Sequence, residues 1–106
     1  MLRLIILSFL CSSAIAGELS PERKAIEDQF NSDQEPISIE ALWTDDMVFK
    51  VGVYDDGSRR DGYAEYICME IHDAGLVGFN ILVRVIDIDK LRRTGEWVNL
   101  GTGYCK

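Results

Sequence analysis

The clearest pattern along the chain is an alternation of hydrophobic and polar residues over Met47–Tyr54. This period-two spacing predicts a strand with one buried face. A second strand is predicted over Ile81–Ile88, where nearly continuous β-branched residues are typical of an interior strand. Between them, Ser58–Gly75 is predicted to be an amphipathic helix, because its apolar residues recur at helical spacing. These apolar positions are Ala64, Ile67, Cys68 and Ile71.

Weaker patterns define the remaining elements. A short helix is predicted over Pro21–Phe30, since Ser20 suits the N-cap and proline the first helical position. Ile37–Trp43 stays open between strand and helix, because two isoleucines alternate but the residues after them also suit a helical turn. Asp89–Gly95 is predicted to form one helical turn, and Trp97–Tyr104 a last strand.

The order of these elements predicts a topology. A strand, a helix and a strand in succession predict two parallel strands joined by a right-handed crossover. The last strand then returns antiparallel to its predecessor. We therefore expect a small two-layer α+β domain with an α-β-α-β-β order, in which two helices cover one face of a mixed sheet of about three strands.

Residues 1–16 carry the three parts of a secretory signal peptide. Arg3 gives a positive start, Leu4–Leu10 is a short apolar run, and Ala14-Ile15-Ala16 matches the small-x-small pattern at cleavage sites. The apolar run is too short to cross a bilayer, which needs about 20 residues. We expect a signal peptide over 1–16, a single domain over 17–106, and a periplasmic or secreted protein without membrane insertion after cleavage.

Removal of the signal peptide makes the chain more acidic. The 106 residues contain 11 Lys and Arg against 18 Asp and Glu, and loss of Arg3 changes the net charge from −7 to −8. Nucleic acids are bound largely through Lys and Arg, so nucleic acid is not expected as a partner. A hydrophobic content of 47% excludes a disordered acidic tail and favours a folded domain.

The cysteines predict one disulfide. Cys11 leaves with the signal peptide, and an even pair in an exported chain, here Cys68 and Cys105, usually forms a bridge. The alternative is a nucleophilic Cys68 activated by His72, four residues further along the same helical face. Export and the position of Cys68 among core residues favour the disulfide.

No motif in the sequence specifies catalysis. The only histidine is His72, and the nucleophile elbow of serine hydrolases is missing. The carboxylate pairs at positions 45–46, 55–56 and 87–89 lack the spacing of a calcium loop and are interpreted as solvated turn residues. We therefore expect a protein that is not an enzyme, with no metal and no cofactor.

A candidate binding site emerges from the predicted topology. The carboxyl ends of two parallel strands share one edge of the sheet, where open α/β sheets bind ligands. The loops that follow those strands carry Arg59, Arg60, Arg92 and Arg93. One hypothesis is that this arginine edge binds a phosphate or carboxylate. The alternative is that neighbouring aspartates neutralise the arginines in surface ion pairs.

Aromatic residues offer a second candidate surface, because Trp, Tyr and Arg dominate interface hot spots. Trp43 and Trp97 are expected in the core, and Tyr66 is expected to be the most exposed aromatic. The leading hypothesis for function is an exported binding protein that recognises a protein partner, as an inhibitor or immunity protein does, with its carboxylates facing a basic partner. The alternatives are a small-anion binder or small enzyme at the arginine edge, and an accessory structural component of a cell-envelope assembly.

Overall fold

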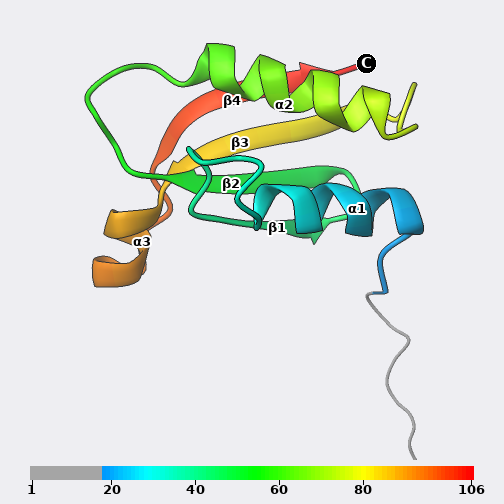
Figure 1. Ribbon diagram of the computed structural model, residues 1–106. Coiled ribbons are helices and arrows are strands. Elements are labelled where there is room, and N and C mark those ends of the chain that lie inside the picture. The colour runs from blue at the N-terminus through cyan, green and yellow to red at the C-terminus, as the bar shows by residue number, and fades with distance from the viewer. Residues whose placement is uncertain (1–17) are drawn as a thin grey trace, which may run out of the picture.

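The computed structural model describes residues 18–106, and the predicted signal peptide lies outside them. Two helices, α1 (Pro21–Phe30) and α2 (Asp61–Asp73), pack on one face of a four-stranded sheet (Figure 1). The strands lie in sequence order: β1 (Glu40–Asp45), β2 (Val48–Val53), β3 (Ile81–Asp87) and β4 (Asn99–Cys105). A short helix, α3 (Ile88–Thr94), follows β3 directly and lies at one end of the sheet.

The predicted strand directions are confirmed. β2 and β3 are parallel, and β4 runs antiparallel to β3. The predicted three strands and two helices are roughly right, but the described domain has four strands and three helices. The extra strand is β1, which arises from the ambiguous segment Ile37–Trp43 and pairs antiparallel with β2. The single helical turn expected after β3 is the seven-residue α3.

The core forms between the helices and the inner face of the sheet. Phe49, Val51 and Val53 of β2 are fully buried, as their alternation predicts. They face the buried residues of the helix layer, which include Phe30 of α1 and Ile67 of α2. The predicted apolar spacing of α2 thus corresponds to its buried side.

Two glycines allow α2 to approach β4 closely. A Cβ atom on Gly101 would lie 2.3 Å from the Arg60 carbonyl carbon, and one on Gly103 would lie 2.9 Å from the Ala64 oxygen. α2 begins at Asp61, three residues after the predicted start at Ser58, and no side chain caps it. Instead, the Asp61 carboxylate accepts a hydrogen bond from the Thr102 N–H at 3.0 Å, which ties the start of α2 to the edge of the sheet.

The predicted disulfide is present between Cys68 of α2 and Cys105 of β4. It joins the helix layer to the edge strand across 37 residues of sequence, and Cys68 therefore carries no free thiol. Within residues 18–106, no helix is long and apolar enough to cross a membrane.

Candidate functional site

The sheet has a second face, directed away from α1 and α2, which the described helices cover only at the corner occupied by α3. At that corner Ile88 packs over Gly52, where an added Cβ would lie 2.8 Å from the Ile88 side chain. We use "the open face" for the outward side chains of the sheet and the neighbouring Trp97. Away from the corner covered by α3, its members are Leu42, Val48, Lys50, Leu82, Arg84, Trp97, Thr102 and Tyr104. The outward row Glu40, Gly52 and Ile86 lies at the α3 corner, where Glu40 pairs with Arg92.

Strand register arranges these side chains in rows. Leu42 pairs with Lys50, Lys50 with Arg84, and Arg84 with Thr102, so one row crosses all four strands. The adjacent row joins Val48, Leu82 and Tyr104. Neighbouring strands lie about 4.8 Å apart, so side chains within a row are in direct reach of one another. The open face thus has a basic centre beside an apolar row.

The two cations at this centre, Lys50 and Arg84, have no carboxylate within 4.0 Å among residues 18–106. The Lys50 ammonium lies over the Trp97 ring, 4.2 Å from its centroid, in a cation–π contact. In a domain with an excess of acidic residues, two adjacent cations without a carboxylate partner are the feature that sequence reasoning missed. The alternation of β2 placed Lys50 on the polar side, but only the register brings Arg84 beside it.

A small pocket of about 100 Å³ lies between the basic centre and α3. Its apolar walls include Leu42, Ile86 and Leu91, and Trp97 and Lys50 border it. Arg92 also borders the pocket, but its guanidinium donates to Glu40 at 3.0 Å. That contact raises the pKa of Arg92 above its ordinary value. The pocket could hold one small side chain of a partner.

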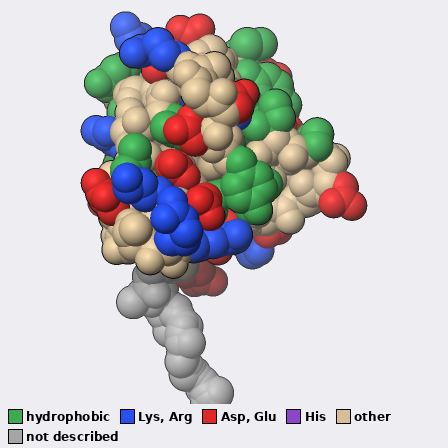
Figure 2. All heavy atoms as spheres, turned by 90° about the vertical axis from the view of Figure 1, so that its left-hand side faces the viewer, with side chains coloured by type: hydrophobic (Ala, Val, Ile, Leu, Met, Phe, Trp, Pro, Cys, Tyr) green, Lys and Arg blue, Asp and Glu red, His purple; other side chains and the backbone are tan. Residues whose placement is uncertain are grey.

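The arginine edge lies where the topology placed it, at the carboxyl ends of β2 and β3, but each arginine is close to a carboxylate of the same chain. Arg59 bonds Asp61, Arg60 lies 3.5 Å from Asp56, Arg92 bonds Glu40, and Arg93 bonds Asp89. Figure 2 faces this end of the molecule and shows basic and acidic side chains interspersed. An incoming anion would have to compete with those carboxylates. Whether the edge binds an anion stays a prediction.

Aspartates of the three carboxylate pairs at positions 45–46, 55–56 and 87–89 accept hydrogen bonds in turns and at a helix cap. The Asp45 and Asp55 carboxylates each accept from a backbone N–H two residues further on. Asp87 caps α3 by accepting from the Lys90 N–H. Ser58 donates to Asp56 through its hydroxyl and its backbone N–H, and these bonds lower the pKa of Asp56. Such turn and cap contacts are typical of aspartate in loops.

The exposed aromatics differ from those expected. Trp43 is in the core, as predicted, but Trp97 is 50% exposed and Tyr104 is 75% exposed. Tyr66, expected to be the most exposed aromatic, is only 37% exposed, and its hydroxyl donates to Glu35 at 2.8 Å. Glu35 lies in the loop between α1 and β1 and is buried. The hydrogen bond to Glu35 holds the Tyr66 side chain against this loop and reduces its exposure.

Comparison of the chain with protein-family models, with curated proteins and with solved structures found no match. Function is therefore inferred from the side chains and surfaces of this chain alone.

Proposed function

We propose that the domain is an exported binding protein that recognises another protein through its open face, in the manner of an inhibitor or immunity protein. One observation carries the proposal: the adjacent cations Lys50 and Arg84 stand without a carboxylate partner among residues 18–106, on a sheet face rich in exposed apolar side chains. Charged groups that lack an intramolecular partner at the centre of an apolar surface are suited to pairing across an interface.

The side chains around this centre are of the types that contribute most to protein interfaces. Trp97 and Tyr104 are exposed aromatics, and Leu42 is 43% exposed. Trp, Tyr and Arg are enriched among interface hot spots, which lie near the middle of a contact surface and are surrounded by groups that exclude water. Because Leu42 and Tyr104 belong to strands of the sheet, their backbone requires little further ordering on binding.

The cations and apolar side chains of the open face support a partner surface with a carboxylate and apolar groups. A carboxylate would lie between Lys50 and Arg84, and apolar groups would contact Leu42, Leu82 and Tyr104. This choice replaces the hypothesis of a basic partner bound by carboxylates, because the cations Lys50 and Arg84 lack a carboxylate partner among residues 18–106 and lie beside exposed apolar side chains. A second copy of the chain fits poorly, because two open faces in contact would bring like charges together.

The location of the protein forms part of the proposal. A disulfide in a chain whose described helices include no membrane span is compatible with an extracellular site. We propose that residues 1–16 direct export to the periplasm or the medium, and that the exported protein begins at Gly17. Mass spectrometry of the exported form tests this: an intact chain that keeps residues 1–16 and stays inside the cell overturns it.

The binding function is tested with two double variants that change the net charge equally. Lys50→Glu with Arg84→Glu reverses the basic centre, and Arg59→Glu with Arg93→Glu reverses two cations of the arginine edge. Each protein, immobilised, is exposed to envelope and medium proteins of the producing cell, and the affinity for the protein that the wild type retains is then measured. We expect at least a ~10-fold loss for the open-face variant alone, since like-charge contacts across an interface cost several kcal/mol.

The other outcomes are informative. Equal retention by both variants, or retention of no partner by the wild type, overturns the proposal. Loss only in the Arg59 and Arg93 variant supports the anion-binding alternative instead. The accessory role in a cell-envelope assembly, which no observed contact specifically favours, stays a prediction.

A further inference from the structure

The two edges of the sheet differ in how their outward backbone groups are bonded. At the β1 edge, the Asn31 side chain bonds both the N–H and the C=O of Ala41, at 2.9 and 2.8 Å. The Trp43 N–H donates to the Glu27 carboxylate at 3.2 Å. Side chains of α1 and its C-cap thus occupy the positions where another strand would bond, which is one way in which proteins protect an edge strand.

The first half of the β4 edge is occupied in a similar way. The Leu100 carbonyl accepts from the Arg60 N–H at 2.9 Å, and the Thr102 N–H donates to Asp61. Outward and inward backbone groups alternate along an edge strand, so the next outward groups are the Thr102 C=O and both backbone groups of Tyr104. Within residues 18–106 these three groups have no hydrogen-bond partner.

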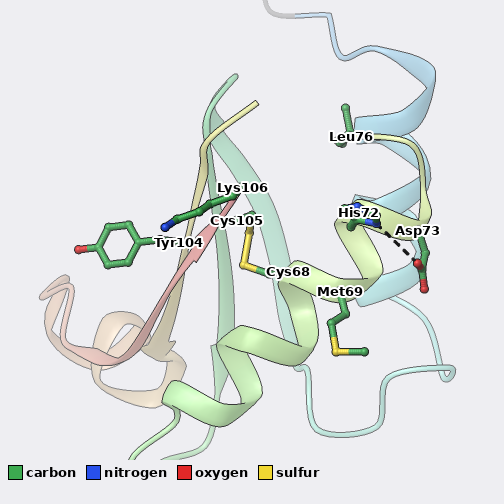
Figure 3. Close-up of a pocket in the computed structure, with 8 residues that line it drawn as sticks. All are labelled: Cys68, Met69, His72, Asp73, Leu76, Tyr104, Cys105 and Lys106. Atoms are coloured by element: carbon green, nitrogen blue, oxygen red, sulfur yellow. Dashed lines mark ion pairs between the residues drawn. A yellow bond between two sulfur atoms is a disulfide. The ribbon is translucent and has the colours of Figure 1, made fainter. Parts of the chain in front are cut away.

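A groove of about 480 Å³ runs beside this unbonded stretch, between α2 and the end of β4 (Figure 3). The disulfide lies in the middle, and the side chains of Met69, His72 and Leu76 come from the helix side. Tyr104 borders the groove from the strand, but its ring points away from the disulfide. Met69 is 63% exposed and offers an apolar contact on the helix side of the groove. The disulfide fixes the separation of the two walls by linking α2 to β4.

We propose that this groove binds an extended peptide segment of another protein, which adds to β4 as a fifth strand. The peptide backbone bonds the Tyr104 N–H and C=O and the Thr102 C=O, and an apolar side chain of the peptide enters the groove beside Met69 and the disulfide. Peptide recognition of this kind combines main-chain hydrogen bonds for affinity with a side-chain pocket for specificity. The site uses the backbone of Thr102 and Tyr104, whose side chains belong to the open face, and it requires no contact with Lys50 or Arg84.

The alternation of side chains explains how both sites can exist on one strand. Tyr104 directs its side chain to the open face and its backbone groups to the edge, because side chains stand perpendicular to the plane of the ladder. An extended segment in the groove therefore leaves the Tyr104 ring available to a partner on the open face.

The test uses a phage-displayed library of random linear decapeptides and the disulfide-bonded protein. Selected peptides, made synthetically, are expected to slow hydrogen exchange of the Tyr104 amide. The backbone nitrogens of the peptide are methylated one at a time. Methylation of a nitrogen that donates to the Thr102 or Tyr104 carbonyl is expected to weaken binding by at least about tenfold, since it removes a main-chain hydrogen bond and adds a clash with β4.

Two matched pairs of variants locate the site. Tyr104→Pro removes the N–H and is expected to weaken binding at least about tenfold, whereas Tyr104→Val keeps it and retains binding within about threefold. Met69→Asp is expected to weaken binding and Met69→Leu to preserve it. Thermal unfolding and a free-thiol assay verify that each variant folds with its disulfide formed. If Tyr104→Pro does not fold, the Met69 pair alone decides.

Three results would overturn the proposal: a library that yields no binder, peptides insensitive to backbone methylation, or equal binding by Met69→Asp and Met69→Leu. Peptides lost only with the Lys50→Glu and Arg84→Glu variant belong to the open face and also overturn it. Failure of the open-face experiment leaves this groove unaffected, because Lys50 and Arg84 do not line it. The Met69 pair separates the two sites, since Met69 belongs to the groove alone, whereas Tyr104 belongs to both.

Discussion

Asn31 hydrogen-bonds Ala41 in the way that a neighbouring strand would. Its Nδ2 donates to the Ala41 carbonyl at 2.8 Å, and its Oδ1 accepts from the Ala41 N–H at 2.9 Å. A side-chain amide carries the same donor and acceptor as a peptide group, so one asparagine can saturate one residue of an edge strand. Because Asn31 is also the C-cap of α1, the end of the helix and the protection of β1 depend on the same side chain.

Replacement of Asn31 by Leu is expected to release the edge of β1. The variant loses two hydrogen bonds to Ala41, which lowers the free energy of unfolding by about 1–2 kcal/mol. It also exposes a bonding edge, so self-association is expected in analytical ultracentrifugation. Asn31→Asp is the control for self-association: it keeps the acceptor for the Ala41 N–H and places a charge at the edge, so it should stay monomeric. Its carboxylate, facing the Ala41 and Glu27 carbonyls, should also lower stability. An Asn31→Leu protein that is monomeric and as stable as the wild type would contradict the role of Asn31.

Close packing of α2 on β4 makes a second prediction. Gly103→Ala places a Cβ 2.9 Å from the Ala64 oxygen, and the required shift of α2 is expected to cost about 1–3 kcal/mol of stability. Gly101→Ala should cost at least as much, since its Cβ meets Arg60 backbone atoms at 2.3 Å. Gly62→Ala has free space around its Cβ and should be neutral or stabilise α2 by up to about 1 kcal/mol. Urea unfolding of the three variants tests this ranking, and equal midpoints for Gly62→Ala and Gly103→Ala would disprove it.

The disulfide is expected to contribute a large share of stability. Replacement of Cys68 and Cys105 by Ser opens a 37-residue loop in the unfolded chain, which corresponds to about 3–4 kcal/mol on the chain-entropy model. A small domain has little stability in excess of this. Urea unfolding with and without reductant provides the measurement. Reductant should destabilise the wild type and leave the double variant unchanged, and any other pattern contradicts the prediction.

Sequence patterns located the elements that have a strong hydrophobic period. β2 and β3 followed from alternation and from β-branched residues, and α2 from its apolar spacing. β1 could not be assigned, because its strand conformation depends on pairing with β2 and on the two bonds from Asn31. Neither the pairing with β2 nor the bonds from Asn31 can be predicted from the residues of β1 alone.

The candidate sites were less predictable than the fold, because they depend on contacts between distant residues. The arginine edge was placed correctly in the topology, but the pairing of Arg92 with Glu40 spans 52 positions of sequence. Trp97 was expected in the core, yet it lies in the loop before β4 and contacts Lys50 on the open face. The neighbouring positions of Lys50 and Arg84 required the register of β2 and β3.

Tyr66 and Glu35 make the stability of the helix layer sensitive to alkaline pH. The Tyr66 hydroxyl donates to the buried Glu35 carboxylate, which also accepts from the Gln29 side chain at 2.8 Å. The hydrogen bond to Glu35, followed by burial, raises the pKa of Tyr66 to about 12 from its ordinary value of 10.0. Ionisation of Tyr66 would place a negative charge beside that carboxylate.

The sign of the pH effect follows from this shift. Between pH 10 and about pH 12 the folded protein holds the Tyr66 proton more tightly than the unfolded chain does, so the stability from this group is complete below pH 10 and is lost as the pH rises toward 12. Tyr66→Phe keeps the ring but removes the hydroxyl, so the variant should be less stable by about 1 kcal/mol at neutral pH, and its stability should fall less steeply above pH 10. Tyr104→Phe, at a position 75% exposed, is the matched control and should follow the wild type. Urea midpoints across this range decide: parallel curves for the wild type and Tyr66→Phe would show that the bond to Glu35 does not govern the alkaline transition.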